Sequence, residues 1–177
     1  MNIGIVGCGA ISGIYLRNLH RLPGVAVQAL ADLDPARAAA KLDELRTRWR
    51  EWDLPGDAPA KLPRVLTVPA LLADPEVDLV LNLTVPKAHA EIAIAALQAG
   101  KHTYSEKPLG IDREEGRQIL ETAARSGRIV GCAPDTFLGA GIETCRQNVD
   151  EAVVRRDFRP YSRIGGKETV DDRRQDL

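Results

Sequence analysis

Residues 2–12 read Asn-Ile-Gly-Ile-Val-Gly-Cys-Gly-Ala-Ile-Ser, an apolar run followed by closely spaced glycines. The apolar run predicts a short strand, and the residues after the glycines predict the start of a helix. In such a turn Gly7 permits the sharp change of direction, and Gly9 lets the main chain approach a pyrophosphate. The amides that follow direct partial positive charge at that group. Because the third small position holds Ser12 rather than glycine, the loop alone is only a weak indication of a dinucleotide site.

A carboxylate follows the next predicted strand, residues 25–31, and strengthens this interpretation. Asp32 ends that apolar run about 20 residues after the glycine turn, where a carboxylate can accept both hydroxyls of an adenosine ribose. Its charge would repel a 2′-phosphate, so Asp32 favours NAD over NADP, although the nearby Arg37 leaves NADP open. Alternatively, Asp32 only flanks the helix that Asp34 caps and Pro35 begins. The strand, turn, helix and strand context favours cofactor binding.

Length, composition and charge restrict the class of protein. The chain has 177 residues, 44% of them hydrophobic, which is enough to build the core of about one domain. With 24 basic and 25 acidic residues, its composition does not suggest a nucleic acid or an anionic membrane as partner. No apolar stretch approaches membrane-spanning length and the first residues predict a strand, so we expect a cytoplasmic protein. Cys8, Cys132 and Cys145 are far apart and predict small buried side chains, not disulfides, nucleophiles or metal ligands.

Strand and helix patterns alternate along the chain, which indicates an α/β fold with a parallel sheet covered by helices on both faces. Further strands are expected near residue 65 and over residues 78–84, 102–105 and 128–132. Helices are expected over residues 11–22, 35–52, 70–73, 86–99 and from a capping box at Asp112 and Glu115 to Gly127. The predicted buried faces are Ile11, Ile14, Tyr15, Leu19 and Leu22 in the first helix, and Leu42, Leu45, Trp49 and Trp52 in the second.

Glu106-Lys107-Pro108 follows the strand predicted at 102–105 and carries the predicted chemistry. A lysine at the carboxyl edge of a sheet that holds a nicotinamide can reach the atom undergoing hydride transfer. Its ammonium can stabilise negative charge on a substrate oxygen or exchange a proton with it. The alternative is an exposed loop lysine paired with Glu106; Pro108 favours the functional role because it restricts the local backbone.

Together these motifs resemble the Gfo/Idh/MocA oxidoreductases, the relatives of glucose-fructose oxidoreductase and inositol dehydrogenase, over residues 1 to about 150. The motifs are Gly7–Ser12, Asp32, Asn82–Pro86 with His89, Ala99–His102 and Glu106–Pro108. The resemblance implies a Rossmann-type doubly wound sheet, NAD or NADP, and reversible hydride transfer between the nicotinamide and a sugar, polyol or related alcohol. A methyltransferase on the same general fold is disfavoured by Glu106-Lys107-Pro108.

The resemblance also implies roles for individual residues. The pyrophosphate would lie against Gly7, Cys8, Gly9, Ala10 and Ile11, the ribose at Asp32, the nicotinamide side along Thr84, Pro86 and His89, and the reacting centre beside Glu106 and the catalytic Lys107. For His89 the alternative is a half-exposed histidine bonded to a carbonyl. His20 and His102 are expected to be structural, and no metal site is indicated.

The resemblance divides the chain into three predicted segments. Residues 1–133 would be the NAD(P)-binding Rossmann domain, and residues 134–150 a crossing segment and helix that lead into the family's second α/β domain. Residues 151–177 are highly charged and predict a disordered or loosely docked tail, so we expect that second domain to be missing and the chain to be truncated. Two functions stay open: a dehydrogenase completed by a partner subunit, as in a homo-oligomer, or an inactive dinucleotide-binding fragment without a substrate pocket.

Overall fold

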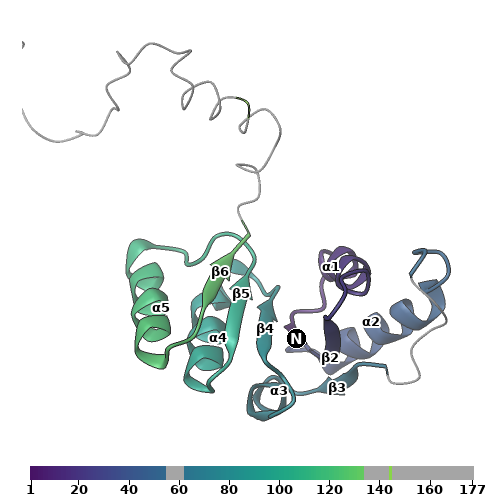
Figure 1. Ribbon diagram of the computed structural model, residues 1–177, viewed down its shortest axis with the longest axis horizontal. Helices are drawn as coiled ribbons and strands as arrows, with labels where there is room; N and C mark the ends of the chain where they lie inside the picture. Colours follow the sequence, from purple (N-terminus) through teal and green to yellow (C-terminus); the bar gives the residue numbers. More distant parts are fainter. Residues whose placement is uncertain (55–61, 134–143, 145–177) are drawn as a thin grey trace, which may run out of the picture. The chain divides into compact units, whose positions relative to one another are not determined.

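Six short strands form one sheet in a computed structural model that describes residues 1–54, 62–133 and 144 (Figure 1). The strands are β1 (Asn2–Val6), β2 (Ala26–Ala31), β3 (Arg64–Leu66), β4 (Leu79–Asn82), β5 (His102–Ser105) and β6 (Val130–Cys132). All neighbouring pairs are parallel, in the order β3-β2-β1-β4-β5-β6. This is the order of a Rossmann-type doubly wound sheet, and it confirms the predicted fold class. Apart from residue 144, the predicted segments 134–150 and 151–177 lie outside the described residues.

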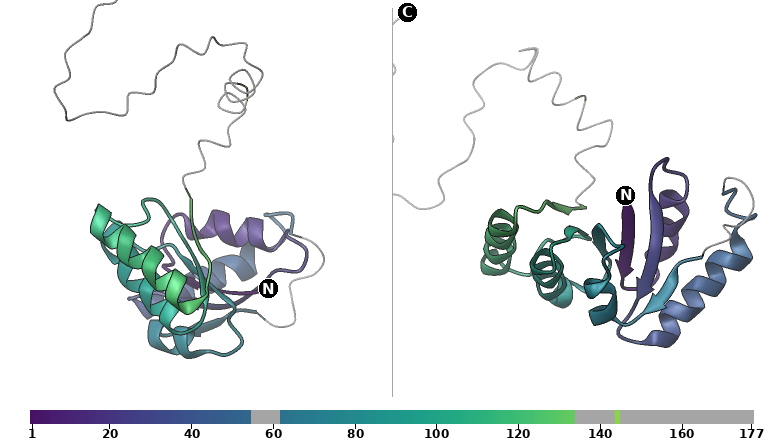
Figure 2. Two further views of the ribbon diagram at one scale, coloured as in Figure 1. Left: turned by 60° about the vertical axis from the view of Figure 1, so that its left-hand side comes forward. Right: turned by 60° about the horizontal axis from the view of Figure 1, so that its bottom comes forward.

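Two sets of helices cover the sheet. The helices are α1 (Ser12–Leu19), α2 (Pro35–Arg48), α3 (Val68–Ala73), α4 (Pro86–Gln98) and α5 (Arg113–Ser126). Because side chains of a strand alternate between faces, Ile3 and Ile5 of β1 pack with α1 and α2, whereas Val6 packs with α3 and α4. Figure 2 shows α4 and α5 side by side, apart from α1 and α2. At Gly4 a Cβ would lie 2.8 Å from the Leu71 side chain of α3, so a larger residue there would require Leu71 to shift.

Local signals set the helix ends largely as predicted. Asp34 accepts a 3.0 Å hydrogen bond from the backbone N–H two residues ahead, and Pro35 starts α2. Asp112 accepts a 2.8 Å bond from the N–H of Glu115, and α5 ends at Gly127 with a left-handed φ of 65°. Only half of the predicted capping box forms, because the Glu115 carboxylate accepts from the Ile111 N–H instead of from that of Asp112.

The buried face of α1 differs from the prediction. Leu16 and Ser12 are fully buried, whereas Ile11 is 46% and Ile14 60% exposed, so those two isoleucines do not belong to the core. The helix approaches the sheet directly after the tight turn, and a small residue must face the strands there; Leu16 then follows one turn later on the same face. The helix also ends earlier than predicted, and Leu22 lies beyond it and is exposed.

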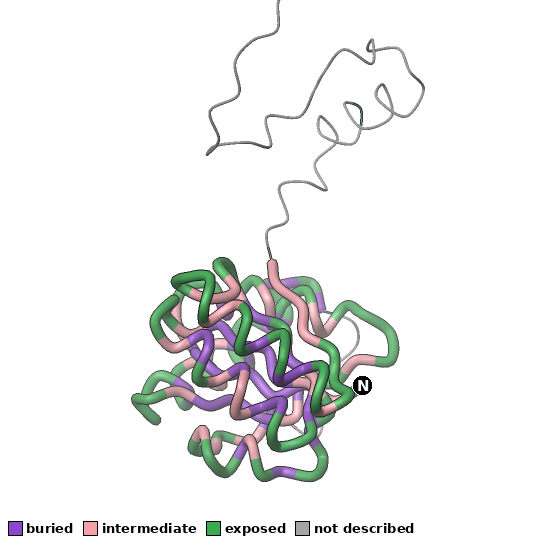
Figure 3. The backbone as a smooth tube through the Cα atoms, turned by 90° about the vertical axis from the view of Figure 1, so that its left-hand side faces the viewer, coloured by how far each residue is buried: buried purple, intermediate pink, exposed green. Residues whose placement is uncertain are grey.

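The tryptophans lie in the core, as predicted. Trp49 and Trp52 are 6% and 8% exposed and pack with the apolar side chains between α1, α2 and the sheet, although α2 itself ends at Arg48. His20 lies edge-on to Trp49 with ring centroids 5.1 Å apart, which is a structural role. Figure 3 shows the buried positions running through the strands and the inner helix faces. No helix within residues 1–54 and 62–133 is long and apolar enough to cross a membrane.

Candidate functional site

The first glycine of the β1–α1 loop is required by the protein itself. Gly7 has a φ of +99°, a backbone conformation that residues other than glycine rarely adopt. A Cβ on it would lie 2.6 Å from the carbonyl carbon and oxygen of Leu83, just beyond β4. Its own N–H donates to the carbonyl of Ala31 at 2.8 Å. The loop therefore passes between the ends of β2 and β4 with no room for a side chain.

The second glycine, Gly9, has no such requirement from the protein. A Cβ built on it meets no atom within 4 Å, so the missing side chain leaves open space beside the loop backbone. Ser12 is fully buried and donates a 2.7 Å hydrogen bond from Oγ to the Gly9 carbonyl, which closes the turn. Ser12 thus replaces the expected third glycine with a side chain that holds the loop in shape.

The helix starts around this loop fall into two groups. Side chains of Asp34, Thr67 and Asp112 cap α2, α3 and α5. In contrast, α1 begins after Ile11 and α4 after Val85, and neither N-cap residue forms a side-chain capping bond. Their first-turn N–H groups have no side-chain partner of that kind, and their dipoles favour an anion at both places. This feature fits a pyrophosphate held at the loop.

Asp32 joins the loop to the following helix. Its Oδ2 accepts a 2.7 Å hydrogen bond from the Cys8 N–H, and its Oδ1 accepts a 3.0 Å bond from the Asp34 N–H. Each carboxylate oxygen has a further lone pair, so the group can still accept ribose hydroxyls. Arg37 lies nearby and forms an ion pair with Asp34 at 4.0 Å.

A cleft of about 470 Å³ brings these residues together. It is lined by Gly7, Gly9, Asp32, Leu33, Asp34, Arg37, Leu83, Thr84, Val85 and Ala88. Leu33 is 98% exposed and Val85 66%, which places two apolar side chains beside the polar Asp32 and Thr84. The sequence analysis did not name these two residues as site residues. Their position directly after Asp32 and Thr84, at the ends of strands, could have indicated that they line the cleft. Such a surface suits the flat apolar face of a base or nicotinamide ring.

Asn82 and Thr84 shape the turn between β4 and α4. Asn82 is fully buried, and its Oδ1 accepts hydrogen bonds from the Thr84 hydroxyl at 2.6 Å and from the Thr84 N–H at 3.3 Å. Pro86 then begins α4. The predicted edge residues are therefore in place, but only Thr84 of the predicted trio Thr84, Pro86 and His89 lines the cleft.

His89 is buried, so the half-exposed ring of its structural alternative is wrong. Its side chain is 1% exposed, with Nε2 3.0 Å from the Thr84 carbonyl oxygen and Nδ1 2.6 Å from that of Pro108. The ring therefore bonds carbonyl groups, as its structural alternative predicted. A contact between His89 and a cofactor stays a prediction.

Glu106 and Lys107 lie beside the cleft lining, at the end of the strand next to β4. The Glu106 N–H donates to the Asn82 carbonyl at 2.9 Å, which continues the β4–β5 pairing. Its carboxylate accepts a 2.6 Å hydrogen bond from the Tyr15 hydroxyl of α1 and a 3.1 Å bond from the Lys107 N–H. Tyr15 is a contact that sequence analysis missed, because it joins residues from two distant elements.

The Lys107 side chain is exposed, and the peptide bond between Lys107 and Pro108 is cis. In the part of the chain that the structure describes, the Lys107 backbone N–H, and not its ammonium, bonds to Glu106, and the catalytic role of Lys107 stays a prediction.

The two described cysteines, Cys8 and Cys132, have thiols with a raised pKa. Cys8 is 5% exposed, and burial together with the Asp32 charge raises the pKa of its thiol to about 12. Burial also raises the pKa of the Cys132 thiol, and Cys145 lies outside the described residues. Thiols in such surroundings stay protonated and inert at neutral pH. Among the described residues no group of three or more His, Cys, Asp or Glu side chains is placed to hold a metal ion.

Residues 1–133 match a family described as an oxidoreductase family with an NAD-binding Rossmann fold, GFO_IDH_MocA. Inositol 2-dehydrogenase of Salmonella paratyphi B is 30% identical over 129 residues, which are 72% of this chain and 34% of that protein. This chain thus spans about a third of the length of the curated relatives it matches.

Solved structures share the fold. Biliverdin reductase from Synechocystis sp. PCC 6803, in complex with biliverdin and NADP+, has a TM-score of 0.65 at 27% identity, over 84% of this chain and 42% of that one. GenD2 from gentamicin A biosynthesis, in complex with NAD, has a TM-score of 0.71 at 22% identity, over 86% of this chain and 40% of that one.

Proposed function

The chain belongs to the Gfo/Idh/MocA oxidoreductase family, whose members have an NAD-binding Rossmann fold, and from this premise we propose that its cleft binds NAD. The pyrophosphate would lie against the loop from Gly7 to Ile11, and the adenosine ribose against Asp32. The observation that carries the proposal is the loop itself: a Cβ on Gly9 would meet no atom of the described residues within 4 Å, and the helix that follows has no side-chain cap.

Asp32 supports NAD over NADP. Its carboxylate lines the cleft where the ribose hydroxyls would bind, and a 2′-phosphate there would meet its charge. Arg37 is the nearest cation in the lining, but it already forms an ion pair with Asp34. The solved neighbours include one with NAD and one with NADP+, so they do not separate the two cofactors.

The proposed reaction is hydride transfer between the nicotinamide and a sugar, polyol or related alcohol, with NAD supplying the hydride acceptor. Curated relatives named inositol 2-dehydrogenase support this substrate class. Lys107 would direct its ammonium at the substrate oxygen and stabilise the negative charge that develops there. The exposed position of the Lys107 side chain supports this role.

A second candidate is a dinucleotide-binding module without turnover of its own. The described residues show a candidate dinucleotide cleft, which is the one feature that this second candidate requires. An enzyme must hold the cofactor, the substrate and a proton-transfer group together. Assay of a polyol and sugar panel with NAD separates the two candidates: turnover that Lys107→Ala abolishes supports the dehydrogenase, and tight NADH binding without turnover supports the module.

Titration of NADH and NADPH, followed by fluorescence, tests the cofactor assignment. We expect Asp32→Asn to weaken NADH binding about tenfold, since a hydrogen bond to a charged acceptor contributes about 1.5–3 kcal/mol. The substitution should also reduce the preference of the protein for NADH over NADPH. Asp43→Asn is the matched control, because Asp43 is an exposed aspartate on α2 that pairs only with Arg46 across the helix surface. A folded protein that binds neither dinucleotide would contradict the assignment.

A further inference from the structure

His89 lies where three segments of the chain meet. It belongs to the first turn of α4, and its buried ring reaches the carbonyl of Thr84 on one side and that of Pro108 on the other, at 3.0 Å and 2.6 Å. Thr84 lies in the cleft lining, and Pro108 directly follows Lys107. The ring thus connects the β4–α4 turn with the segment that carries the proposed catalytic lysine.

Asn82 holds the same region from the other side. Its Nδ2 donates a 3.0 Å hydrogen bond to the backbone carbonyl of His89, and its Oδ1 accepts both bonds from Thr84. Its own carbonyl accepts from the Glu106 N–H. Asn82 and His89 are both at least 99% buried, so water cannot replace these bonds without rearrangement.

The chemistry of the ring suits it to join two acceptors. Carbonyl oxygens only accept hydrogen bonds, so both contacts are hydrogen bonds at the same time only when both ring nitrogens carry protons. A glutamine in its place retains one donor group, and a leucine retains none while occupying comparable space. These two substitutions therefore remove the connection in steps.

We propose that His89 is a positioning residue, which fixes the Thr84 turn and the Lys107–Pro108 segment relative to each other. The proposal rests on the proposed function, because it explains how the nicotinamide end of the cleft keeps its shape. A displacement of about 1 Å of such groups is enough to cost about a hundredfold in rate.

Amide hydrogen exchange and NADH titration on the full chain test this role. In His89→Leu we expect the amides of residues 84–86 and 106–109 to exchange about tenfold faster or more, and NADH affinity to fall about tenfold, with smaller changes of both in His89→Gln. Amides of β1 should keep their protection. Measurements well below each variant's Tm separate positioning from global stability, because the protein is then fully folded.

His102→Gln is the matched control. His102 is a partly buried histidine at the opposite end of β5, where its Nδ1 accepts from the Ile129 N–H, far along the strand from the proposed site. We expect this substitution to leave unchanged both the NADH affinity and the amide exchange of residues 84–86 and 106–109. If His89→Leu does not fold, His89→Gln and Asn82→Ala provide the same comparison.

Failure of this inference differs from failure of the proposed function. If the unsubstituted protein binds no NADH, the cofactor assignment is wrong, while the exchange measurement still tests the connection. If it binds NADH and the His89 variants match His102→Gln in both affinity and local exchange, then His89 only fills the core and the positioning role is overturned.

Discussion

Single residues in the loop show how one residue type can serve two purposes. Gly7 is required by backbone conformation and by its approach to Leu83, whereas the space beside Gly9 is used by no protein atom. The sequence analysis assigned Gly7 to the sharp turn and Gly9 to the approach of a pyrophosphate, and the resemblance placed both against that group. The structure adds the backbone conformation and the approach to Leu83 that require a glycine at position 7.

This difference leads to opposite expectations for two alanine substitutions. Gly7→Ala should lower the free energy of unfolding by about 2 kcal/mol or more, since it adds strain at a positive φ and a backbone overlap. Gly9→Ala should leave stability within about 0.5 kcal/mol but weaken NADH binding, because the added methyl group occupies the space beside the loop. Urea unfolding and NADH titration check the pair. A stable, fully folded Gly7→Ala protein would contradict the first expectation.

Because of Cys8, we expect the free energy of unfolding to depend on pH in the alkaline range. The folded thiol has a pKa of about 12, against an ordinary value of 9.0, so the unfolded chain loses this proton first. The contribution of Cys8 is therefore complete below pH 9 and is lost as pH rises from about 9 toward about 12, with a slope of at most about 1.4 kcal/mol per pH unit. We measure the free energy of unfolding with urea between pH 8 and 10.5. It should fall less steeply with pH for Cys8→Ala than for the unsubstituted protein. Equal slopes would exclude this linkage.

At the scale of elements, local signals predicted the starts of α2 and α5 and the buried face of α2, but not the buried face of α1. Asp34 and Asp112 cap their helices as expected, because a cap needs only residues that are near in sequence. The apolar spacing in α1 suggested a face with Ile11 and Ile14, whereas Leu16 is the buried residue. Periodicity finds a helix without showing which side the neighbouring strands cover, and the tight turn decides that side.

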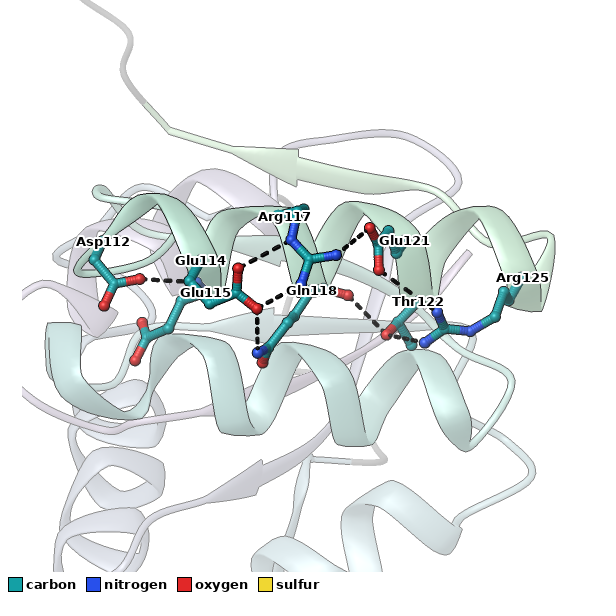
Figure 4. A network of polar contacts seen from close by, with 8 residues as sticks. All are labelled: Asp112, Glu114, Glu115, Arg117, Gln118, Glu121, Thr122 and Arg125. Carbon is teal, nitrogen blue, oxygen red and sulfur yellow. Dashed lines mark hydrogen bonds and ion pairs between the residues drawn. The ribbon is translucent and has the colours of Figure 1, made fainter.

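Helix α5 illustrates the difference between a cap and a surface network. In Figure 4, Arg117 lies between Glu114 and Glu121 on the exposed side of the helix. Hydrogen bonds from Arg117 and Gln118 lower the pKa of Glu114 to about 2, but both members of the Arg117–Glu114 pair are fully exposed to solvent screening. The network therefore contributes less to stability than its number of bonds suggests.

We expect Asp112→Ala to lower the free energy of unfolding by about 1 kcal/mol, because it leaves the Glu115 N–H at the start of α5 without its side-chain partner. Arg117→Ala should change the Tm much less, and its effect should disappear in high salt. Thermal unfolding at low and high ionic strength compares the two variants. A larger loss for Arg117→Ala would show that the surface network stabilises the helix more than its cap.

For the whole molecule, strand order creates the site. The chain crosses over so that β1 lies between β2 and β4, and the three strands bring Gly7, Asp32 and Thr84 to one edge. In doubly wound sheets a crevice lies at the carboxyl ends of the strands, at the point where the strand order reverses. Residues separated by long stretches of sequence therefore meet in one cleft.

By itself the sequence determined the element order, the glycine turn, the place of Asp32 after β2 and the caps at Asp34 and Asp112, because these depend on residues close together in the chain. Only the tertiary structure decided that His89 is buried between Thr84 and Pro108, that Tyr15 reaches Glu106, and that Leu33 and Val85 line the cleft. These contacts join distant segments. They depend on how closely neighbouring strands and helices approach, which spacing along a sequence does not record.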